Sequence, residues 1–68
     1  MAKKKMKIKI NGTDISGSYN ALKDLETVYT LAAIQQREMG HLMVHSRLMD
    51  IAININHQLT EQLGEMTN

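Results

Sequence analysis

Apolar and polar positions follow a helical rhythm from Ser18 to Leu63, a stretch without proline in which Gly40 is the only glycine. Steps of three and four residues separate the apolar positions, and a second run resumes after Met39. Such spacing places side chains on one face of a helix. The positions of this helical face, three of which hold a polar residue, are Leu22, Leu25, Tyr29, Ala32, Gln36 and Met39, then Leu42, His45, Met49, Ala52, Asn56, Leu59, Leu63 and Met66.

Gly40 allows two interpretations of this helical region. A glycine costs a helix interior about 1 kcal/mol relative to alanine, but it is also common just past a helix end. A connection between two helices usually holds roughly 2–8 residues, mostly polar. The neighbours of Gly40 include Met39, Leu42 and Met43, with no polar cluster. We therefore predict one long helix, kinked or broken at Gly40, with two antiparallel helices as the alternative.

The region before the helix has the period of a strand, because residues 6–10 alternate between apolar side chains and lysines. Asn11-Gly12 follows, and this pair is the strongest short-range signal for a hairpin because both central residues of a type I′ turn need a positive φ. Residues 13–16 can form the return strand. Ile15 is then expected on the apolar face of the hairpin, with Lys7 and Lys9 facing solvent.

These elements predict a single small α+β domain, with a β-hairpin over residues 1–16, a helical region over 18–63 and a tail over 64–68. Ser18 is expected to cap the helix, with Ser16 and Asn20 as alternatives, and Gly64 to lie just past its end. A chain of 68 residues buries only about 60% of its unfolded surface, and this one has no cysteine. Since only another chain could cover a long helix, a helical homo-oligomer is predicted.

Charge is distributed unevenly along the chain. The first ten residues carry five lysines and no acid, whereas residues 11–68 carry three basic and seven acidic residues. A basic arm can contact the phosphates of nucleic acid, and it can also protect an edge strand from aggregation. Nucleic-acid binding is therefore an alternative function, and it would use Lys3, Lys4, Lys5, Lys7 and Lys9.

Arg37, His41 and His45 stand at intervals of four residues, and Arg47 follows closely. Repeated around the symmetry axis of an oligomer, these four residues would make a pocket for an anion, and arginine is suited to bidentate contacts with phosphate. The alternative is that the arginines are solvated, next to Glu38 or Asp50. The predicted ligand-binding residues are Arg37, His41, His45 and Arg47.

Glu38, His41 and His45 also have a spacing that can hold a metal ion on a helix. A dinuclear site would need a second Glu-x-x-His, and the sequence has none. The histidines then fit a polar break in a helix interface. The sequence has no cysteine and no nucleophile elbow with a serine between glycines, so it offers no activated nucleophile. We expect no metal, no cofactor and no enzymatic activity.

The leading hypothesis is a non-enzymatic, homo-oligomeric binding protein. Its size and composition are typical of phage and mobile-element inhibitors that sequester a host protein or a nucleotide-like anion, which is an analogy of architecture and not of any motif. A purely structural oligomerisation module is a further alternative. No segment reaches the roughly 18 apolar residues of a membrane span, and no signal peptide is recognisable, so a cytoplasmic location is expected.

Overall fold

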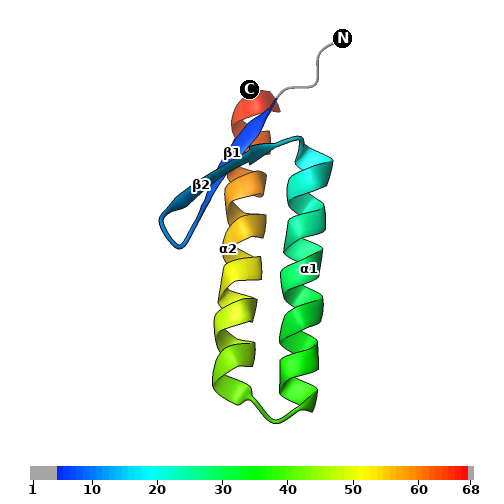
Figure 1. Cartoon of the computed structure of the whole chain (residues 1–68). Helices are drawn as coiled ribbons and strands as arrows, with labels where there is room; N and C mark the ends of the chain where they lie inside the picture. Colours follow the sequence, from blue (N-terminus) through cyan, green and yellow to red (C-terminus); the bar gives the residue numbers. More distant parts are fainter. Residues whose placement is uncertain (1–4, 68) are drawn as a thin grey trace.

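The computed structural model describes the backbone of residues 5–67 and the side chains of residues 5–64. Two antiparallel helices lie side by side, and a β-hairpin crosses one end of the pair (Figure 1). The α+β class is confirmed, whereas the single long helix is wrong. The elements are β1 (Met6–Ile10), β2 (Thr13–Gly17), α1 (Tyr19–Glu38) and α2 (Leu42–Thr67).

The hairpin forms as its sequence predicts. Asn11 and Gly12 have φ values of 50° and 81°, the positive values that a type I′ turn requires. The turn sets an antiparallel register in which Ile8 lies opposite Ile15. Lys7 and Lys9 are exposed, and the apolar residues between them are buried. The alternation in the sequence therefore corresponds to the two faces of the strand.

Gly40 ends α1 instead of bending it. Its φ is 84°, and its N–H donates to the carbonyl of Arg37 at 3.0 Å, while the N–H of His41 donates to the carbonyl of Gln36 at 2.9 Å. These two bonds form a Schellman motif, with glycine at the left-handed position. The connection needs no polar side chains because the backbone itself satisfies the last carbonyls. One long helix was predicted because no polar cluster surrounds Gly40, but a Schellman motif does not require one.

The other predicted helix ends give one success and one error. The Ser18 hydroxyl accepts a hydrogen bond from the N–H of Ala21 at 3.2 Å, so Ser18 is the N-cap of α1. In contrast, α2 passes through Gly64 and continues to Thr67, so the predicted tail at 64–68 is wrong as far as residue 67. A glycine lowers the stability of a helix. It ends the helix only where its backbone adopts the left-handed conformation.

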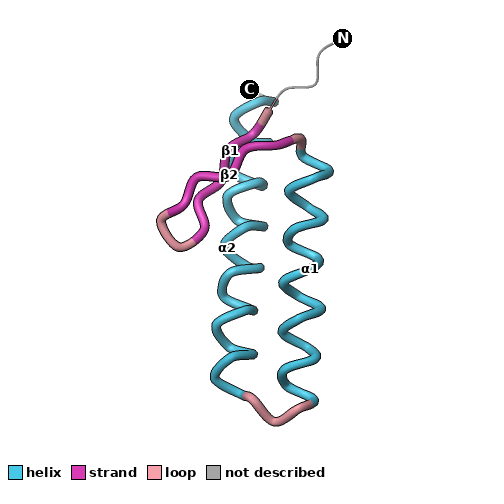
Figure 2. Tube along the Cα trace, in the orientation of Figure 1, coloured by secondary structure: helices cyan, strands magenta, loops and turns pink. Residues whose placement is uncertain are grey.

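The main core lies under the hairpin. Met6, Ile8 and Ile10 project from β1 onto Leu22 of α1 and onto α2, where Ile55 and Leu59 complete the buried cluster. Figure 2 shows that the strands cover only one end of the helix pair. Towards the other end the helices cover each other, and the buried residues there are alanines, Ala33 and Ala52. Small side chains let the two helices approach closely.

Side chains of α2 cover the free edge of β1. In this register the backbone groups of Lys7 and Lys9 point away from β2. The N–H of Lys9 donates to Gln58 Oε1 at 2.8 Å, and Gln58 Nε2 donates back to the carbonyl of Lys9 at 2.9 Å. Gln62 Nε2 donates to the carbonyl of Lys7 at 2.7 Å. The two glutamines therefore act as a substitute strand along this edge.

Candidate functional site

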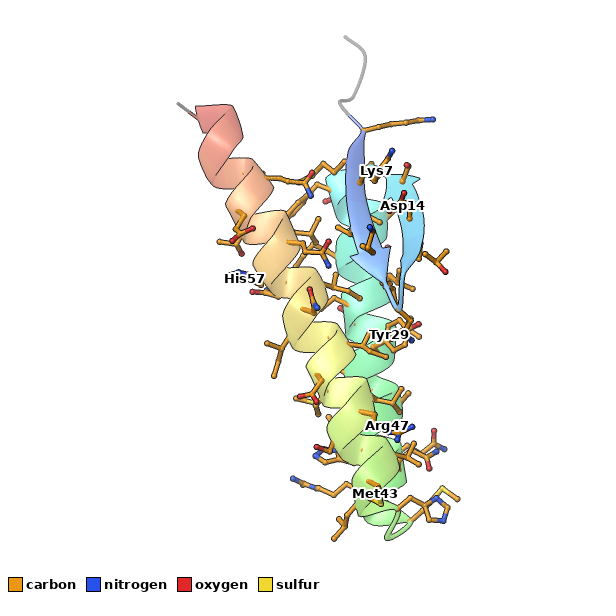
Figure 3. The ribbon with its side chains drawn as sticks, turned by 90° about the vertical axis from the view of Figure 1, so that its left-hand side faces the viewer. Lys7, Asp14, Tyr29, Met43, Arg47 and His57 are labelled. Atoms are coloured by element: carbon orange, nitrogen blue, oxygen red, sulfur yellow. The ribbon has the colours of Figure 1, made fainter. Side chains whose placement is uncertain are left out.

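Exposed and half-buried apolar side chains lie on the side of the helix pair that faces away from the hairpin. On α2, Ile51 packs against the core under the hairpin. Ile53 lies roughly 200° further round the helix, since each residue turns by about 100°, and it is 60% exposed. Leu42 and Met49 lie on the same side as Ile53, at spacings of eleven and four residues. Figure 3 places His57, four residues after Ile53, opposite the hairpin.

The first helix contributes to the same face. Ala33 is fully buried between the helices, so Ile34, one residue on, projects from the side away from the hairpin and is 40% exposed. Thr30 and Thr27 lie one and two turns before it, and their hydroxyls donate to the carbonyls of Glu26 and Lys23. Because these hydroxyls are bonded within the helix, the threonines present mainly methyl groups to solvent. We name Thr30, Ile34, Leu42, Met49 and Ile53 the open helical face.

The open helical face runs along the long dimension of the molecule, which measures 45 × 20 × 18 Å. Exposed apolar side chains scattered singly are normal on a monomer, but a continuous apolar patch usually marks an interaction site. The open helical face is therefore the main candidate for a functional surface.

The predicted anion-binding residues gather only in part. Arg37 lies in the last turn of α1, three residues after Ile34, and it is exposed. His41 lies in the turn, with Nδ1 2.8 Å from Gln36 Oε1. His45 lies in the first turn of α2, half-buried, with Nδ1 2.8 Å from the carbonyl of Ala33. These three residues share the turn end of the helix pair, although the continuous helix that suggested their grouping does not exist.

Arg47 lies elsewhere. It follows His45 by two residues, so the two side chains leave α2 in directions roughly 200° apart. Figure 3 shows Arg47 on the hairpin side of the helices. There it lines a groove of about 420 Å³ between the hairpin tip and α2, together with Lys9, Ile10, Asn11, Asp50, Ile51 and Asn54. Asp50 opposes the two cations, so the groove is less suited to an anion than its arginine suggests.

The lysine arm is described only in part, since Lys3 and Lys4 lie outside the described residues. Lys5, Lys7 and Lys9 are exposed. Lys7 projects from the outer face of β1 (Figure 3), and Lys9, two residues on, belongs to the same face of the strand. Binding of nucleic acid through these lysines stays a prediction.

Asn56 forms a contact between the helices within one chain. Its Nδ2 lies 3.4 Å from both carboxylate oxygens of Glu26 on α1. Lys23 Nζ lies 2.7 Å from Glu26 Oε1, and this hydrogen bond to a carboxylate raises the pKa of Lys23 above its ordinary value of 10.5. Asn56 therefore helps to set the register of α2 against α1.

The turn between the helices separates the residues whose spacing suggested a metal site. Glu38 is the last residue of α1 and His41 precedes α2, so the two do not share a helix face. Among the described residues, no three histidine or acidic side chains are grouped as metal ligands.

Neither helix, in the part that is described, has an apolar stretch long enough to cross a membrane.

Comparison with known proteins gives no relative. No protein-family model, no curated protein and no solved structure matches the chain. The function therefore has to be inferred from the surfaces described above.

Proposed function

We propose that this chain is a non-enzymatic binding protein that works as a homo-oligomer, assembled through the open helical face. Two copies that join these faces would form a four-helix bundle, with a hairpin on each outer side. Helices of such bundles pack through apolar side chains on facing stripes. The partner that this surface fits best is a second copy, because one pair of helices offers the same length and the same apolar stripe as the other.

The observation that carries this proposal is the exposure of large apolar side chains in a very small protein. Leu42, at the start of α2, is 65% exposed, and Ile53, close to the middle of α2, is 60% exposed. Among the side chains of residues 5–64, the core holds eight buried residues, three of them on one strand, which gives a chain of this length limited stability. Burying the open helical face would add apolar contact at about 25 cal/mol per Å².

Ile53→Glu should abolish assembly through the open helical face. A charged carboxylate at the centre of an apolar interface would lose its hydration without gaining a partner. Size-exclusion chromatography with light scattering would show the wild-type chain at a multiple of 7.7 kDa and the variant at a smaller mass. Val28→Glu is the matched control, because Val28 is also 60% exposed but lies one turn from Leu25, on the hairpin side of α1. A monomeric wild-type chain, or two variants that behave alike, would contradict the proposal.

We further propose that the assembly binds a phosphate-bearing anion at its turn end. Arg37 supports this, because it lies one turn beyond Ile34 and would be repeated across an interface built on the open helical face. His41 and His45 lie beside it, and each ring bonds within the chain through Nδ1, which leaves Nε2 as the second polar group. Convergent arginines and imidazoles are groups that hold phosphates.

Arg37→Ala should weaken the binding of ATP, used here as a nucleotide probe, by about tenfold to a hundredfold, since a hydrogen bond to a charged group contributes about 1.5–3 kcal/mol. Isothermal titration calorimetry would measure this. Arg47→Ala makes the same change of charge on the hairpin side and should leave the affinity nearly unchanged. Equal losses in both variants would indicate unspecific attraction of charge, and a wild-type chain that does not bind ATP would remove this nucleotide from consideration.

A further inference from the structure

The outer edge of β2 has backbone groups without a partner strand. The two-residue turn makes Ile10 and Thr13 a hydrogen-bonded pair, so the bonds between the strands recur at Ile8 with Ile15 and at Met6 with Gly17. The N–H and C=O groups of Asp14 and Ser16 therefore point away from β1. Both residues are exposed.

The two edges of the hairpin differ in how they are covered. Along β1, Gln58 and Gln62 bond to the outward groups of Lys9 and Lys7. Along β2, no described side chain takes this role for Asp14 or Ser16. An uncovered edge is a template for a further strand. The hairpin can therefore be extended on one side only.

One register of two β2 strands uses every outward group. If two copies pair antiparallel about a two-fold axis at Ile15, Asp14 of each copy lies opposite Ser16 of the other. Both pairs are then hydrogen-bonded pairs, which gives four bonds across the axis. Centring the axis on Asp14 would place Ser16 opposite Gly12, inside the turn. Centring it on Ser16 would place Asp14 opposite Ser18, the cap of α1.

The same register matches side chains on both faces of the sheet. On the inner face Ile8 lies opposite Ile15, so pairing at Ile15 would align four isoleucines in one row across four strands. Ile15 is half-buried in the single chain and would gain an apolar neighbour. On the outer face each Asp14 would lie between Lys9 of its own copy and Ser16 of the other, so that no two aspartates meet. Like charges directly opposite each other destabilise a sheet.

We propose that a second copy of this chain docks on the β2 edge, so that two hairpins form one four-stranded antiparallel sheet with strand order β1-β2-β2-β1. This interface is separate from the open helical face, and it does not depend on that proposal. A chain that has both interfaces can join more than two copies, because each two-fold contact leaves the other surface available.

Amide hydrogen exchange followed by NMR tests the edge in the unmodified chain. The N–H groups of Asp14 and Ser16 should exchange fast in dilute protein and at least about tenfold more slowly at concentrations where light scattering shows assembly. Lys9 is the internal control, because its N–H is bonded to Gln58 within the chain and should be equally protected at both concentrations. Fast exchange of Asp14 and Ser16 in the assembled protein would overturn the proposal, as would a chain that is monomeric at every concentration.

A pair of variants gives the second measurement. Ser16→Pro removes the outward N–H, whereas Ser16→Thr keeps it. Proline is tolerated in an edge strand where the N–H faces solvent. Far-ultraviolet circular dichroism would check that both variants fold. We expect the proline variant to lose at least one stage of assembly that the threonine variant retains. Identical assembly in two folded variants would overturn the proposal. The helical-face proposal fails separately, through Ile53→Glu.

Discussion

Leu22→Ala is expected to lower the free energy of unfolding by about 3 kcal/mol, the usual cost of removing a buried leucine side chain. Leu22 is only 2% exposed and packs in the cluster under the hairpin, between β1 and α2. The chain is small, so a loss of this size should lower Tm by about 15 °C. Thermal unfolding followed by circular dichroism would measure the change.

Leu31→Ala is the matched control for this experiment. The same side chain is removed from the same helix, but Leu31 is 61% exposed, so the expected loss is below about 0.5 kcal/mol. The comparison should be made at one protein concentration, because assembly adds to the apparent stability. Similar losses in the two variants would show that Leu22 is not part of a packed core.

Gly40→Ala and Gly64→Ala are expected to change stability in opposite directions. The φ of Gly40 is 84°, and nothing lies within 4 Å of an added Cβ, so the cost of alanine there comes from the left-handed backbone alone and amounts to about 1–2 kcal/mol. Gly64 lies inside α2, again with nothing within 4 Å of an added Cβ. Alanine at this position should add about 0.5–1 kcal/mol.

Urea unfolding of the two variants would measure both signs. The pair also distinguishes the two architectures that the sequence allows. In one continuous helix Gly40→Ala would stabilise the chain, because alanine is the better helix former. If the helix ended at Gly64 with a left-handed residue, Gly64→Ala would destabilise it. The first result would contradict the helical hairpin, and the second would contradict an α2 that continues to Thr67.

The sequence could name the candidate functional residues, but it could not place them in the fold. Arg37, His41 and His45 do lie together, but for a reason that the spacing did not contain, since the chain reverses at Gly40 and brings the two helix ends to one place. Arg47 is separated from them because a helix turns by about 200° over two residues. The roles of Gln58 and Gln62 were not foreseen, although their i, i+4 spacing puts both on one face of α2.

The sequence by itself determined what depends on a few neighbouring residues. Asn11-Gly12 sets the turn and therefore the register of the strands, Ser18 caps α1, and the alternation in β1 assigns its two faces. These features follow from local backbone geometry, so they do not depend on where the segment lies in the fold. The α+β class and the helical content follow in the same way.

Only the tertiary structure decided how the helical region divides and which surfaces remain open. The apolar spacing is compatible with one helix or two, because Gly40 can be placed in a helix at a modest cost or can end it in the left-handed conformation. The choice depends on contacts between residues far apart in sequence, such as Leu22 with Leu59 in the core and Ala33 with His45 near the turn. The same packing covers the edge of β1 and leaves β2 and Ile53 exposed, which no local pattern could show.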